Sequence, residues 1–238
     1  MMARLRRTRV TATAYTVSLN IRELDDDGVM SLVLAADYQV PDFEQWWAAL
    51  LGSLPRLPRL GAHHVVVYRA LEDPSRVFVT MGVRERGPVD ALLRSPVLFS
   101  WFDLAGVEEI PPMFVGEVVE KLDLADTAAA GDQAGVVIVA MIVPVGQVDH
   151  LRVGIHHAIT RIEASGVRRF WIYRGLDDPA EAMILQEIAS ERQARRWIRH
   201  PDAAARFMSH AGEGAYPPPF VGRLVETIEV PAPSADPQ

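Results

Sequence analysis

The sequence predicts an α+β protein built from two fused copies of one β-α-β-β-α-β unit. The first observation is an internal repeat, because the segment YRALEDP at 68–74 returns as YRGLDDP at 173–179. The flanking residues stay in register at the same spacing of 105 residues, and a fixed spacing of this kind is the signature of repeated structural units. The second observation is that both copies show the same order of strand and helix patterns.

The first two elements of each copy are a strand and a helix. Apolar runs of strand length occupy 29–36 and 136–143, and the second run is rich in β-branched residues. Apolar residues recur at three- and four-residue steps across 148–162, which predicts an amphipathic helix. The equivalent helix of the first copy is expected to stop before Pro55 or Pro58, since proline breaks a helix interior.

A hairpin follows in each copy, with the repeated segment at its turn. Its strands are predicted at 64–69 and 76–81, and again at 169–174 and 182–187. The Asp-Pro pair of the repeated segment supplies a turn-initiating carboxylate and a fixed φ.

Two interpretations of the Tyr-Arg pair in the repeated segment stay open. In one, the arginines pair with the turn aspartates, Arg69 with Asp73 and Arg174 with Asp178. In the other, tyrosine and arginine line the mouths of two equivalent pockets and bind an anionic substrate.

Each copy ends in a helical region and a strand. Proline interrupts both helical regions at equivalent positions, so two pieces are predicted in each, at 88–94 and 96–104 and at 191–199 and 201–211. Prolines then introduce the last strands, 111–120 and 217–226.

The resulting division of the chain has five parts. They are an arm or edge strand at 1–28, one repeat at 29–122, a linker rich in Ala, Asp and Gly at 123–135, the second repeat at 136–230 and a disordered tail at 231–238. A β-α-β-β-α-β unit is ferredoxin-like and leaves one face of its sheet bare. The two four-stranded sheets are therefore expected to pack together as a pseudo-dimeric α/β barrel.

Composition bounds the function. The chain has 49% hydrophobic and 23% charged residues, which is typical of a soluble globular protein, and its net charge of −7 argues against nucleic-acid binding. It has no cysteine, which excludes disulfides and a thiolate nucleophile, and no apolar stretch long enough to span a membrane. We expect a cytoplasmic protein, either a monomeric pseudo-dimer or a larger homo-oligomer.

The second copy resembles a known superfamily. The residues that carry the resemblance are Tyr173-Arg174, Asp178-Pro179, Glu187, Ser190-Glu191, Ala194, Trp197, His200-Pro201, Met208 and Ala211-Gly212. They are similar to the dimeric α/β-barrel superfamily, in its antibiotic-biosynthesis-monooxygenase-like branch. The resemblance covers 136–230 well and 29–122 more weakly.

The resemblance implies small-molecule chemistry without fixing the reaction. The superfamily includes cofactor-independent monooxygenases acting on polycyclic aromatics, haem-degrading enzymes, isomerases and proteins of no known activity, and fold alone warrants no reaction. The haem-degrading members use an Asn, a Trp and a His, and their Trp position falls near Ile188 and is empty here. Haem degradation is therefore the weaker interpretation, and no cofactor is expected.

The candidate site residues lie in the second copy. His200 is the candidate base, with Glu187 as a second catalytic residue. Substrate binding is assigned to Trp197, Tyr173, Arg174 and Trp171, around an apolar or aromatic molecule between sheet and helices. A binding protein without turnover is the alternative, since no complete catalytic set is present.

Histidines elsewhere do not indicate a metal site. His150 and His157 are seven residues apart, whereas pairs of helical metal ligands usually stand four apart. His63 and His64 are adjacent in a strand, so their rings are expected on opposite sides of the sheet.

Overall fold

The computed structural model describes residues 32–124, 136–199 and 219–231, here divided into a first half up to residue 124 and a second half from residue 136. The first half contains β1 (Leu32–Gln39), α1 (Phe43–Ser53), the 3-10 helix η1 (Leu54–Leu60), β2 (Ala62–Ala70), β3 (Arg76–Val83), α2 (Arg86–Leu93), α3 (Pro96–Leu104) and β4 (Met113–Asp123). The second half contains β5 (Val137–Pro144), α4 (Val148–Ala164), β6 (Val167–Gly175), β7 (Glu181–Ile188), α5 (Glu191–Arg199) and β8 (Phe220–Glu229). The helix predicted at 201–211 lies outside the described residues.

The strands of the described residues form one closed antiparallel barrel in the order β1-β3-β2-β8-β5-β7-β6-β4. Leu32 pairs with Val83, and the residues 105 positions later, Val137 and Ile188, pair in the same way. The predicted α+β fold is therefore confirmed. The two sheets are also joined edge to edge, by β2 with β8 and by β4 with β6. We call these two contacts the seams.

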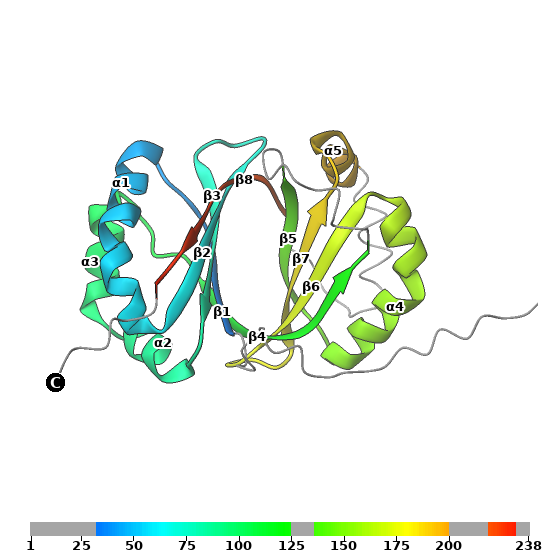
Figure 1. Cartoon of the computed structure of the whole chain (residues 1–238), viewed down its shortest axis with the longest axis horizontal. Helices are drawn as coiled ribbons and strands as arrows, with labels where there is room; N and C mark the ends of the chain where they lie inside the picture. The colour runs from blue at the N-terminus through cyan, green and yellow to red at the C-terminus, as the bar shows by residue number, and fades with distance from the viewer. Residues whose placement is uncertain (1–31, 125–135, 200–218, 232–238) are drawn as a thin grey trace, which may run out of the picture.

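Side chains alternate between the inside of the barrel and its helix-covered outside. Helices α1, α2 and α3 lie on one side of the barrel and α4 and α5 on the opposite side (Figure 1). Each half has its own core between strands and helices. A third cluster draws on strands of both halves and fills the barrel: Val33, Ala35, Tyr68, Phe78, Phe114, Ile138, Ala140, Tyr173, Met183, Leu185 and Phe220.

Local sequence explains where the helices begin and end. The Asp42 side chain caps α1 by accepting hydrogen bonds from two backbone N–H groups of its first turn. Ser95 caps α3, whose first residue is Pro96, as the sequence predicts. The chain ends α1 before Pro55 and continues as η1, which stops where Gly61 adopts a φ of 71°.

A glycine stands at each seam where the strands and an aromatic ring come close. A Cβ added to Gly116 would lie 2.7 Å from the carbonyl oxygen of Arg174 on the partner strand and against the ring of Phe114. A Cβ on Gly222 would lie 2.8 Å from the carbonyl oxygen of Arg69 and against the ring of Phe220. Both positions therefore require glycine for barrel closure.

We expect Gly116→Ala and Gly222→Ala each to lower the free energy of unfolding by about 1–3 kcal/mol, the usual cost of overpacking. Gly154→Ala is the control, because an added Cβ in α4 meets nothing within 4 Å. It should raise stability by up to about 1 kcal/mol through better helix propensity. Urea unfolding of the three variants measures this, and unchanged stability of both seam variants would contradict the requirement.

Candidate functional site

The sequence-predicted site residues do not all face one space. Trp171 and Tyr173 belong to the barrel interior, and Glu187 faces the same way because it alternates with Leu185 on β7. Arg174 follows Tyr173 in β6 and therefore points to the opposite face. Trp197 belongs to α5, and His200 lies outside the described residues.

A cluster of polar side chains lies inside the barrel around Glu187. Arg169 on β6 lies directly opposite Glu187 on β7, and its Nη1 is 3.3 Å from Glu187 Oε2. Its Nε is also 3.3 Å from Asp123 Oδ1 at the end of β4. Burial, and after it the negative charge of Glu187, raise the pKa of the Tyr68 hydroxyl above its ordinary value. Tyr68 and Glu187 come from different halves, so this group forms only when the barrel closes.

Histidines occupy the corresponding place in the first half. There His64 lies opposite Gly82, and the register of β2 shifts between Ala62 and His64. Such a bulge breaks strict alternation, so His63 and His64 turn to the same side, with their Nδ1 atoms 3.0 Å apart. The expectation that the two rings lie on opposite sides of the sheet is therefore wrong.

The arginines of the repeated segment do not pair with the turn aspartates. Arg174 forms an ion pair across the seam with Glu117 on β4, in place of Asp178. Arg69 donates from Nε to the carbonyl oxygen of Pro74 at 2.6 Å and lies over the ring of Phe43. The predicted pairing is wrong because Arg174 finds a carboxylate on a strand of the other half, which local sequence does not show, and Arg69 is held by a backbone carbonyl and an aromatic ring of its own half. The turn itself is confirmed, since the Asp178 side chain accepts from the N–H of Ala180.

An open cleft of about 640 Å³ lies at the end of β1, and we call it the β1 cleft. It is lined by Asp37, Tyr38, Gln39, Pro41, Ser75 and the segment 108–112 before β4. Asp37 accepts two hydrogen bonds from the guanidinium of Arg76, with the Nε–Oδ1 distance at 2.8 Å. Sequence reasoning missed this cleft, although a single carboxylate in the apolar run of β1 is a signal that could have indicated it.

Tyr38 lies beside the β1 cleft, and its side chain points to the helix-covered face of β1, opposite to that of Asp37. Tyr38 is buried, and its hydroxyl accepts from Trp46 Nε1 at 3.0 Å. Its ring meets Phe102 of α3 edge to face, with 5.7 Å between centroids. Burial raises the pKa of Tyr38, while the hydrogen bond from Trp46 lowers it. Tyr38 therefore stays neutral and fixes the end of β1 against α1 and α3.

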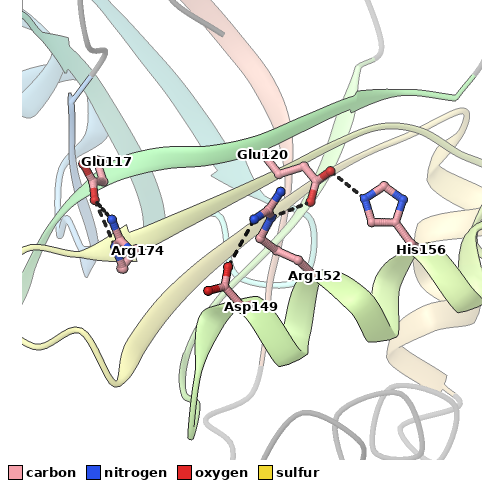
Figure 2. A network of polar contacts seen from close by, with 6 residues as sticks. All are labelled: Glu117, Glu120, Asp149, Arg152, His156 and Arg174. Carbon is pink, nitrogen blue, oxygen red and sulfur yellow. Dashed lines mark hydrogen bonds and ion pairs between the residues drawn. The ribbon is translucent and has the colours of Figure 1, made fainter. Parts of the chain in front are cut away.

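A separate network joins β4 to α4 (Figure 2). Glu120 accepts from Arg152 Nε at 3.0 Å and lies 2.6 Å from His156 Nε2, while Arg152 also reaches Asp149 at 3.1 Å. The side chains of Glu120 and Arg152 are only 12% and 17% exposed, so they are screened from solvent. This network links the two halves. Among the described residues, no cluster of three or more His, Asp or Glu residues could hold a metal ion.

We expect Glu120→Ala to lower the free energy of unfolding by about 2 kcal/mol, because it removes the hydrogen-bond partner of both Arg152 Nε and His156 Nε2 at a site screened from solvent. Asp149→Asn is the matched control, since the Asp149 side chain is 79% exposed and its ion pair contributes less than about 0.5 kcal/mol. Equal effects of the two substitutions in chemical unfolding would show that the network has no structural role.

Stability should fall as pH rises above about 10, the pKa of tyrosine in an unfolded chain. The folded protein keeps Tyr68 protonated to higher pH than the unfolded chain does, so the unfolded state binds fewer protons in this range. Tyr68→Phe removes this contribution, so the loss of stability with rising pH should be less steep. The contribution of Tyr38, whose pKa is also raised by burial, remains in the variant. Urea midpoints of both proteins between about pH 9 and 11 test this, and identical slopes would contradict it.

None of the described helices is long and apolar enough to cross a membrane. No protein-family model and no curated protein matches the chain.

Solved structures do match. An anthrone oxidase-like protein is 12% identical with a TM-score of 0.63, over 84% of this chain and 94% of that one. A candidate monooxygenase from Fusobacterium nucleatum is 6% identical with a TM-score of 0.53, over 84% and 95% of the two chains. The TM-scores establish a shared fold, and at identities this low they establish the fold alone. The chain therefore has the dimeric α/β-barrel fold that its sequence resembles, with both halves of the barrel supplied by one polypeptide.

Proposed function

We propose that this protein binds a small apolar or aromatic molecule in the β1 cleft and oxidises it with O₂, without a cofactor. The observation that carries the proposal is the cleft itself, which places the Asp37 carboxylate, paired with Arg76, in an open space at the end of β1. Its volume of about 640 Å³ falls within the range of small-molecule sites. The similarity of fold to an anthrone oxidase-like protein supports the reaction class by analogy.

The lining suits a neutral, ring-shaped substrate. Pro41 and Ile110 offer apolar surface, while Gln39 and Ser75 offer hydrogen-bonding groups. The carboxylates around the cleft disfavour an anionic ligand on entry.

Asp37 is the proposed base. Arg76 holds both carboxylate oxygens, yet each oxygen keeps a second lone pair that can accept a proton. Proton removal from an activated CH₂ group would leave a carbanion, which the neighbouring Arg76 guanidinium would stabilise. The carbanion adds O₂ to give a peroxide anion, to which Asp37 returns its proton. The hydroperoxide then loses its C–H proton as the O–O bond breaks, so one oxygen atom stays as a carbonyl group and the other leaves as water.

The site predicted from sequence in the second half remains a competing proposal. It assigns His200 and Glu187 to catalysis and Trp197, Tyr173, Arg174 and Trp171 to binding. A single pocket between sheet and helices would not contact all of them. Trp171, Tyr173 and Glu187 face the barrel interior, whereas Arg174 faces outward. A substrate between sheet and helices would therefore not contact Trp171, Tyr173 or Glu187.

We also propose that the protein binds and oxidises its substrate as a monomer. One chain supplies both halves of the barrel, so closure needs no second copy.

Oxygen uptake with a panel of anthrones and quinols tests the reaction. Asp37→Asn keeps the shape of the side chain and should lower turnover by about a hundredfold or more, the usual contribution of a general base. Asp103→Asn is the control, because Asp103 is exposed on α3 outside the cleft. If His200→Ala abolishes uptake while Asp37→Asn does not, the reaction belongs to the second half.

Binding is tested separately by filling the cleft. Ile110→Trp should weaken binding of the best panel compound, whereas Val153→Trp, an equal change at an exposed site on α4, should not. A ligand that raises the unfolding midpoint without any oxygen uptake would show a binding protein and refute the oxidation. Tight binding and degradation of haem would refute the cofactor-independent mechanism.

A further inference from the structure

The β2–β8 seam places two arginines face to face. Arg69 on β2 lies directly opposite Arg223 on β8. Like charges in directly opposed positions of an antiparallel pair repel. At the corresponding place in the β4–β6 seam, Glu117 lies opposite Arg174 and forms an ion pair with it. One seam thus has complementary charges where the other has two cations.

The neighbours of the two arginines neutralise them incompletely. Arg223 pairs with Glu191 of α5, but the same carboxylate also accepts from Arg195 Nε at 2.8 Å. Glu72 adds a second carboxylate, 3.6 Å from Arg195 Nη1, so two carboxylates stand against three arginines. The contacts from Arg195 and Arg223 lower the pKa of Glu191, which stays ionised. Arg69 has a backbone carbonyl and an aromatic ring as partners, and in the described part of the chain no carboxylate pairs with it. Positive charge therefore remains in excess.

These side chains line a second cleft of about 370 Å³, here called the seam cleft. Arg69, Arg195 and Arg223 face it together with Glu191, and Leu71 and Val225 add apolar surface. The chain as a whole carries a net charge of −7, so the cleft is a local reversal of the protein's charge. Such a reversal raises the local concentration of anions.

We propose that the seam cleft binds a small organic oxyanion, a carboxylate or a phosphate monoester with an apolar body, whose oxygens bridge Arg69 and Arg223. The planar guanidinium fork matches both groups with two parallel hydrogen bonds. Arg69 is already oriented for this role, because Phe43 lies 4.4 Å beneath its guanidinium and Pro74 fixes its Nε. Leu71 and Val225 would contact the apolar body.

The site is independent of the proposed oxidation. The seam cleft and the β1 cleft share no lining residue, and their charges are opposite. Failure of anion binding would therefore leave the oxygen-uptake experiment unaffected, and the reverse also holds.

Calorimetric titration of the full chain at low ionic strength tests the proposal, with benzoate, phenyl phosphate and uncharged benzyl alcohol as probes. Benzoate or phenyl phosphate should bind saturably and raise the unfolding midpoint, and benzyl alcohol should do neither. Arg69→Gln and Arg223→Gln should each weaken binding by roughly tenfold or more, the value of a hydrogen bond to a charged group. Arg86→Gln on α2 is the control, because Arg86 pairs with Asp90 and Asp177 away from the cleft.

The pattern of binding decides the ligand class. Binding of benzoate alone identifies a carboxylate, and binding of phenyl phosphate alone identifies a phosphate ester. Absence of saturable binding by both probes, or binding that survives both arginine substitutions, overturns the proposal.

The unfolding midpoint of each variant without ligand distinguishes a loss of binding from a loss of stability. Arg69→Gln should leave it unchanged or raise it, because one of two opposed cations is gone. A merely structural Arg69 would instead give a lower midpoint and unaltered binding. Arg69→Lys keeps the charge but loses the fork, so it should bind the probe more weakly than the native chain and more tightly than Arg69→Gln.

Discussion

Edge-to-edge hydrogen bonding between the two halves is the constraint on which the other features depend. A four-stranded sheet has two exposed edges, and the seams satisfy the backbone groups of all four edges at once. Closure brings Tyr68 of one half beside Glu187 of the other and carries β4 across to α4. It also sets Arg174 opposite Glu117 and Arg69 opposite Arg223. Gly116 and Gly222 stand where the strands must approach most closely.

The sequence predicted what depends on local chemistry and periodicity. Strand and helix order, the proline-started α3, the glycine after η1 and the aspartate turns follow from residue types at short range. The contacts of individual side chains were harder to predict from the sequence. A one-residue bulge reversed the expectation for His63 and His64, and the partner of Arg174 comes from a strand 57 residues earlier. The β1 cleft depends on three segments meeting at a strand end, and the single carboxylate of β1 is its one local signal.

The two halves share a backbone plan and have diverged at the positions that carry charge. The Arg169–Glu187 pair inside the barrel corresponds to His64 and Gly82. Glu120, which pairs with Arg152 of α4, corresponds to Glu226, which is exposed. The β4–β6 seam sets Glu117 against Arg174, whereas the equivalent positions of the β2–β8 seam hold Arg223 and Arg69. One chain therefore offers chemically distinct surfaces at positions that a symmetric dimer would make identical.

The opposed arginines of the β2–β8 seam bear on which halves can recognise each other. In the registers observed, a symmetric pair of first halves would set Glu117 against Arg69 at both of its seams, a self-complementary edge. A symmetric pair of second halves would set Arg223 against Arg174 twice. The second half by itself would thus oppose cations at both seams, whereas the first half offers it one complementary edge through Glu117. Covalent fusion keeps the second half beside a first half, and this favours the mixed pair over a pair of second halves from two chains.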